Sequence, residues 1–115
     1  MYRSQGRYEE SIQAYKQAIQ FDPKDCDALI GIAGASKQLG DYKQASKYIE
    51  RARTLSPGHY NLACLESISG NIEAAVEHLR LALEENPSQR DWARHDPDFE
   101  FIRGDPRFQA LVGED

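Results

Sequence analysis

The chain has 115 residues, of which 40% are hydrophobic and 29% are charged, so it is long enough for one globular domain with a buried core. Its net charge of −5 argues against a binder of nucleic acid or of an anionic membrane surface. The sequence contains neither an apolar run of the roughly 20 residues that a membrane span requires nor a signal-peptide core. A cytoplasmic protein is therefore expected, with Cys26 and Cys64 as reduced thiols.

Residues 1–23 predict one incomplete helical unit. A short stub is expected to end at Gly6, because glycine adopts the left-handed conformation without a steric penalty. The helix that follows carries apolar residues at helical spacing, namely Tyr8, Ile12, Tyr15 and Ile19. It lacks a preceding partner helix of full length, and an uncovered apolar face is typical of an interface. We therefore expect either the C-terminal end of a longer helical array or pairing with a second copy of the chain.

Residues 24–57 predict a complete pair of helices, over residues 25–39 and 42–55, joined at Gly40 and stopped by Pro57. One face of the second helix comprises Tyr42, Ala45, Ile49 and Ala52. The packed stripe of the first helix comprises Leu29, Ile32, Ala33 and Ser36. A separate face of that first helix comprises Asp27, Ile30, Gly34 and Lys37. This second face is therefore expected to point away from its own repeat.

Residues 58–87 predict a shortened pair of helices, the first over residues 59–68 and the second ending before Pro87. Residues 88–115 then predict a helical cap that begins with a short helix carrying Trp92. The cap contains Asp-Pro-x-Phe twice, nine residues apart, and Asp followed by Pro is a strong helix start. The residues expected to cover the last repeat are Trp92, Phe99, Ile102, Phe108 and Leu111.

The three units, the first of them incomplete, form an internal repeat. Glycine recurs at positions 6, 40 and 70, and proline recurs at positions 23, 57 and 87, with matching steps of 34 and 30 residues. This pattern resembles the tetratricopeptide repeat family over residues 1–87. The run over residues 60–64, together with the Asp-Pro-x-Phe tail within residues 88–115, resembles the closing module of many bacterial members. The resemblance implies an all-α fold of helix–turn–helix repeats, stacked as a right-handed superhelix with a C-terminal helical cap.

Catalytic chemistry has little support in the sequence. The three histidines do not lie at metal-binding spacing from one another or from a cysteine. His95, Asp96 and Asp98 form an acidic cluster with a histidine, but a helix end followed by an Asp-Pro cap accounts for all three. We therefore expect no enzyme activity, no cofactor and no metal ion.

The family resemblance instead implies binding of a peptide segment from a partner protein. In that family the first helix of each pair lines a concave groove. On this chain the lining would comprise Arg3, Asp27, Ile30, Gly34, Lys37, Gln38, Tyr60 and Cys64, together with Ser67 and Ile68. Two alternatives stay open, namely self-association through the unpaired N-terminal helix and a regulatory arm of a larger enzyme. Neither nucleic acid nor a membrane is expected as a partner.

Overall fold

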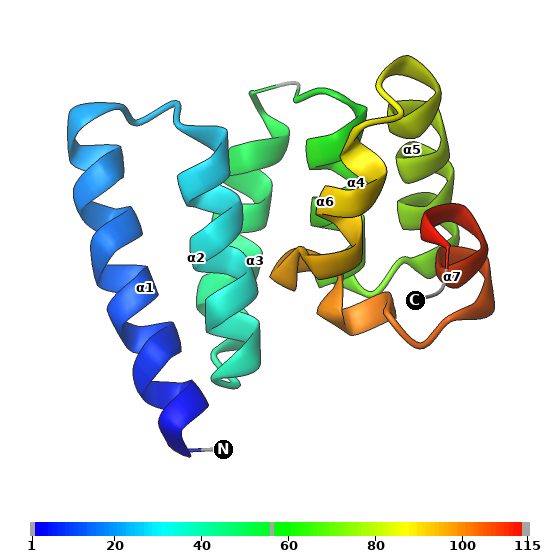
Figure 1. The fold of residues 1–115 in the computed structure, drawn as a ribbon. Helices are drawn as coiled ribbons and strands as arrows, with labels where there is room; N and C mark the ends of the chain where they lie inside the picture. The colour runs from blue at the N-terminus through cyan, green and yellow to red at the C-terminus, as the bar shows by residue number, and fades with distance from the viewer. Residues whose placement is uncertain (1, 56, 114–115) are drawn as a thin grey trace. The chain divides into compact units, whose positions relative to one another are not determined.

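The computed structural model describes the backbone of residues 2–55 and 57–113, and side chains from residue 7 onward within these ranges. Every regular element in the described ranges is helical, which confirms the predicted all-α class (Figure 1). The chain divides into two compact units, Met1–Ser56 and Pro57–Asp115. None of the described helices combines the length and the apolarity that crossing a membrane requires.

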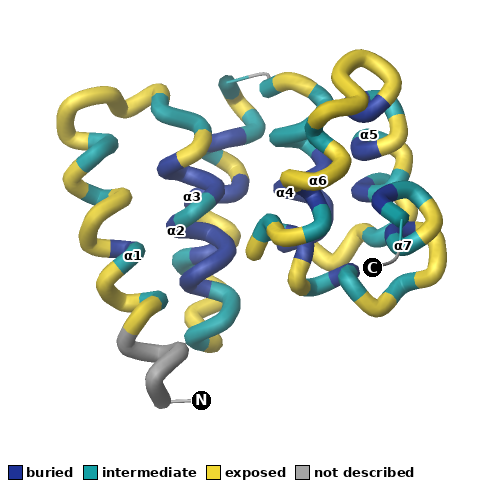
Figure 2. The backbone as a smooth tube through the Cα atoms, in the orientation of Figure 1, coloured by how far each residue is buried: buried dark blue, intermediate teal, exposed yellow. Residues whose placement is uncertain are grey.

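The first unit contains α1 (Tyr2–Phe21), α2 (Cys26–Gln38) and α3 (Tyr42–Arg53), and α2 packs against both of its neighbours. Buried alanines allow these helices to approach closely, because a methyl group takes up less space between two backbones than a larger side chain does. The buried core includes Ile12, Leu29, Ile32, Ala33, Ala45, Ile49 and Ala52. Figure 2 shows α2 as mostly buried, as expected for the middle helix of three.

Acidic caps and one glycine set the ends of the helices in this unit. The Asp25 and Asp41 side chains accept hydrogen bonds from the backbone N–H groups of Ala28 and Gln44, at 3.2 and 3.1 Å, and so begin α2 and α3. Gly40 has a φ of +85°, the left-handed conformation predicted for the turn. α2 and α3 thus form a helix–turn–helix pair joined at Gly40.

The predicted helix end at Gly6 is wrong. α1 runs without a break from Tyr2 to Phe21 and passes through Gly6. Glycine permits a left-handed turn but does not impose one, and continuing the helix keeps its backbone hydrogen bonds at a cost of about 1 kcal/mol relative to alanine. The apolar face of α1 is also partly covered within this unit, because Ile12 is only 6% exposed. The Tyr15 ring lies so close to Gly31 of α2 that a Cβ atom there would stand 2.4 Å from it.

The second unit contains α4 (His59–Ser69), α5 (Ile72–Glu85), α6 (Gln89–His95), η1 (Pro97–Ile102) and α7 (Pro106–Val112). Gly70 has a φ of +87° and ends α4, as predicted. α4 packs against α5 and η1, and α7 packs against α5 and α6. The largest buried side chains of the unit are Leu65, Ile68, Leu79, Phe99, Ile102 and Phe108.

Both Asp-Pro pairs begin helical turns, as predicted. The Asp96 side chain accepts a hydrogen bond from the backbone N–H of Asp98 at 2.9 Å, and Asp105 accepts one from that of Arg107 at 2.8 Å. The phenylalanines that follow, Phe99 and Phe108, are buried with ring centroids 5.5 Å apart. These two short segments therefore form one aromatic layer over α4 and α5.

The cap buries most, but not all, of the apolar residues predicted to cover the last repeat. The prediction that Trp92 covers the last repeat is wrong, because Trp92 is 67% exposed. Its neighbour Ala93 is fully buried instead, so the short α6 turns its small residue inward and its largest residue outward. Leu111 is half-buried, and the other three apolar residues predicted to cover the repeat are buried.

Candidate functional site

The first predicted binding face lies on α2, whose N-terminus is fixed by the Asp25 cap. Asp27 at its first turn is exposed, and Lys37 and Gln38 at its last turn are half-buried. Between them, Ile30 is 2% exposed and Gly34 is also buried. The accessible part of this face therefore consists of polar groups at the two ends of the helix. The side chain of Arg3, which was assigned to the same groove, lies outside the described residues.

Cys26 begins α2 beside this face. Burial, together with the nearby charges of Asp27 and Asp25, raises the pKa of the Cys26 thiol above its ordinary value. The thiol is therefore held in its neutral form near neutral pH. Cys26 and Cys64 are both in the thiol form, as expected from the sequence.

The second predicted face lies on α4, and the chain's own cap occupies it. The Tyr60 hydroxyl donates a hydrogen bond to the Asp96 carboxylate at 2.9 Å, and the Ser67 hydroxyl donates one to the Asp98 backbone carbonyl at 2.7 Å. The Phe99 and Tyr60 rings meet in a T-shaped arrangement, at a centroid distance of 5.6 Å and an interplanar angle of 80°. The residues predicted to line a groove here thus hold the segment from Asp96 to Phe99.

The environment of Tyr60 keeps its hydroxyl protonated. Burial is the largest cause that raises the pKa of Tyr60 far above its ordinary value, and the charge of Asp96 and the hydrogen bond to Asp96 add to it. Tyr60 is therefore a neutral donor throughout the physiological pH range. The exposed Trp92 ring lies 6.1 Å from the Tyr60 ring and extends this aromatic contact toward solvent.

A group of potential metal ligands lies on the same face. The ligand atoms of Cys64, Asp96 and Asp98 lie within 4.8 Å of one another. The sequence had pointed to Asp96 and Asp98 with His95, but His95 is exposed and Cys64 completes the group instead. Both oxygens of Asp96 already accept hydrogen bonds, from the Asp98 N–H and the Tyr60 hydroxyl. The geometry therefore fits a structural cap contact better than a metal centre.

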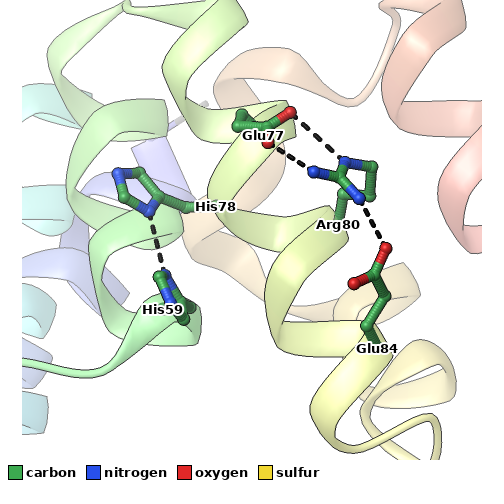
Figure 3. A network of polar contacts seen from close by, with 5 residues as sticks. All are labelled: His59, Glu77, His78, Arg80 and Glu84. Atoms are coloured by element: carbon green, nitrogen blue, oxygen red, sulfur yellow. Dashed lines mark hydrogen bonds and ion pairs between the residues drawn. The ribbon is translucent and has the colours of Figure 1, made fainter.

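A half-buried histidine pair between α4 and α5 was not found from the sequence. The Nδ1 atoms of His59 on α4 and His78 on α5 lie 3.2 Å apart (Figure 3). The residues are 19 positions apart, so no local spacing rule connects them. The packing of α4 against α5 brings the two histidines together, because it places the start of α4 beside the middle of α5. Aligning the two helices of the shortened repeat as an antiparallel pair could have indicated this contact.

Paired helices, left-handed glycines at the turns and a capped end define a helix–turn–helix repeat protein. In the family comparison, the model described as "TPR repeat" matches residues 1–40, and the model described as "Tetratricopeptide repeat" matches residues 27–59 and 56–89. The chain therefore belongs to the tetratricopeptide repeat family. Comparison with curated proteins and with solved structures gave no match. Such repeats are generally protein–protein interaction modules, and their all-helical fold is typically a non-enzymatic scaffold.

Proposed function

We propose that this chain is a non-enzymatic, cytoplasmic interaction module that binds a peptide segment of a partner protein along α2. The observation that carries the proposal is the accessible polar row of α2, formed by Asp27, Lys37 and Gln38. The resemblance to the tetratricopeptide repeat family implies that this helix lines the binding groove. The equivalent face of α4 offers no comparable opening, because Tyr60 and Ser67 already hold the cap.

The charges on α2 favour a particular kind of peptide. Asp27 and Lys37 are ten positions apart, which corresponds to about 15 Å along a helix that rises 1.5 Å per residue. An extended peptide covers this distance in about four to five residues, at about 3.3 Å per residue. The preferred segment therefore carries a basic residue that meets Asp27 and an acidic residue four to five positions away that meets Lys37. Gln38 adds a hydrogen-bonding group beside the acidic end.

A peptide screen followed by charge reversal tests this proposal. An array of extended peptides that vary the separation of one basic and one acidic residue identifies a ligand, and calorimetry measures its affinity. Lys37→Glu is expected to weaken binding about tenfold, or about 1.4 kcal/mol, because it places like charges together. A peptide with lysine at its acidic position should regain affinity for this variant.

The matched control is Lys43→Glu, which makes the same charge change at an exposed position on α3. It is expected to leave the affinity unchanged. Equal weakening by the two variants would indicate general electrostatic attraction and would contradict a specific site on α2. Self-association through α1 stays a separate prediction, which light scattering over a concentration series tests.

A further inference from the structure

The imidazole rings of His59 and His78 meet between two packed helices of one compact unit. His59 is the first residue of α4, and His78 lies in the middle of α5. Both residues are half-buried, and their rings stack with centroids 5.5 Å apart and planes inclined by 28°. Their Nδ1 atoms face each other at 3.2 Å (Figure 3). The contact therefore brings two strong nitrogen ligands together while leaving a path from solvent.

We propose that His59 and His78 form a two-histidine binding site for a divalent transition-metal ion of the zinc, nickel or copper type. Such an ion binds imidazole nitrogen at about 2.0–2.1 Å, and two bonds of this length at a tetrahedral angle place the nitrogens about 3.3 Å apart. The observed separation of 3.2 Å differs little from this value. The nitrogen separation thus suits an ion, and to bind it the two rings turn so that both Nδ1 lone pairs point at the ion instead of along the line between the nitrogens.

The contact without metal is a hydrogen bond in which one ring donates its Nδ1–H to the Nδ1 lone pair of the other. To bind an ion, the donating ring moves its proton from Nδ1 to Nε2, so that both Nδ1 atoms offer lone pairs. The change is a tautomer shift and releases no net proton. Imidazole ligands favour zinc, copper and nickel over magnesium and calcium, which prefer oxygen.

Neighbouring charged groups leave the remaining coordination positions to water or to an external ligand. Glu77 is adjacent to His78, but its two carboxylate oxygens accept hydrogen bonds from Arg80 at 3.3 and 2.5 Å. Arg80 also donates to Glu84 at 2.5 Å, so these three residues form an ion-pair network on the exposed side of α5 (Figure 3). The site is therefore open, with two protein ligands and with Glu77 held back by Arg80.

Calorimetric titration of the full chain with zinc chloride, in a buffer that does not bind metal, tests the proposal. One saturable site is expected, with no binding of magnesium at the same concentration. His59→Ala and His78→Ala should each weaken zinc binding about tenfold or more, because each removes one of two direct ligands. His95→Ala removes an exposed histidine outside the pair and should leave the affinity unchanged.

A measurement on the unaltered chain guards against variants that fail to fold. Side-chain nitrogen NMR during the zinc titration should shift the ring resonances of His59 and His78 and leave those of His95 in place. Absence of saturable zinc binding, equal affinity of all three alanine variants, or a shift confined to His95 would each overturn the proposal.

Discussion

The α2 and α4 helices occupy equivalent places in successive repeats, but the side chains on their equivalent faces make different contacts. Positions 30, 34 and 37 of α2 correspond to positions 60, 64 and 67 of α4, at the constant step of 30 residues. On α4 the hydroxyl groups of Tyr60 and Ser67 bind the cap. On α2 the corresponding residues include a half-buried lysine and no side-chain hydroxyl. The comparison teaches that two or three side chains decide whether a repeat face holds the cap, while the helix pair itself stays the same.

The largest expected effect comes from removing the aromatic side chain that the cap places against α4. Phe99 is fully buried between Tyr60 and Phe108, so Phe99→Ala should lower the free energy of unfolding by about 3–5 kcal/mol. Urea unfolding followed by circular dichroism measures the loss. Amide hydrogen exchange should locate it in the second unit and leave α2 protected.

The control for this change is Trp92→Ala, which removes a larger ring that is 67% exposed. A change within about 0.5 kcal/mol is expected, because exposed side chains contribute little to stability. Similar losses for the two variants would contradict the contrast between a buried and an exposed aromatic residue in the cap.

A smaller effect is expected when the contact between α1 and α2 is disturbed. Gly31→Ala would place a Cβ atom 2.4 Å from the Tyr15 ring, so the ring must move at a cost of about 1–3 kcal/mol, and the helix-propensity gain of about 1 kcal/mol over glycine leaves a net loss of up to about 2 kcal/mol. Urea unfolding measures this loss, and hydrogen exchange should place it in α1 and α2. Gly58→Ala is the matched control, because no atom lies within 4 Å of its added Cβ and its φ of −70° suits alanine. An equal loss at Gly58 would show that the Tyr15 contact is not the cause.

An effect of similar size at neutral pH is expected from Tyr60→Phe, which removes one hydroxyl from the contact between α4 and the cap. The loss of its hydrogen bond to Asp96 should lower stability by about 1–2 kcal/mol. The variant also has a distinctive pH dependence. Because the pKa of Tyr60 is raised on folding, its contribution is complete below the ordinary tyrosine pKa of about 10 and is lost as pH rises above it.

Urea unfolding between pH 7 and pH 11 tests this dependence. Above about pH 10 the unfolded chain releases the phenol proton while the folded chain keeps it, so the unaltered protein should lose stability. Tyr60→Phe should decline less steeply over the same range, and the two stabilities should converge. Parallel curves would show that the phenol of Tyr60 does not contribute to the alkaline loss.

Local rules accounted for most of the fold. Left-handed glycine at positions 40 and 70 and the Asp caps at positions 96 and 105 each depend on a few adjacent residues, so the sequence predicts them directly. The same rule gave a wrong prediction at Gly6, because glycine permits a turn without requiring one. Its conformation depends on whether the chain must reverse direction there, which local residues do not encode.

The candidate site was less predictable because its decisive contacts are long-range. Tyr60 and Asp96 are 36 residues apart, and His59 and His78 are 19 apart, so each pair meets only through helix packing. The repeat pattern identified Tyr60 and Cys64 as members of one face. It did not indicate that the cap would occupy that face, since family resemblance carries helix positions but not the chain segment that lies upon them.

The 36-residue separation between Tyr60 and Asp96 also sets an order of events during synthesis. A ribosome adding about 5–20 residues per second needs about 2–7 seconds to extend the chain from the first residue to the second. During that interval α4 has been made, but Asp96, whose carboxylate accepts the hydrogen bond from the Tyr60 hydroxyl, has not. The nascent chain therefore passes through a period in which its last repeat is uncovered, and a co-translational chaperone would meet that surface only then.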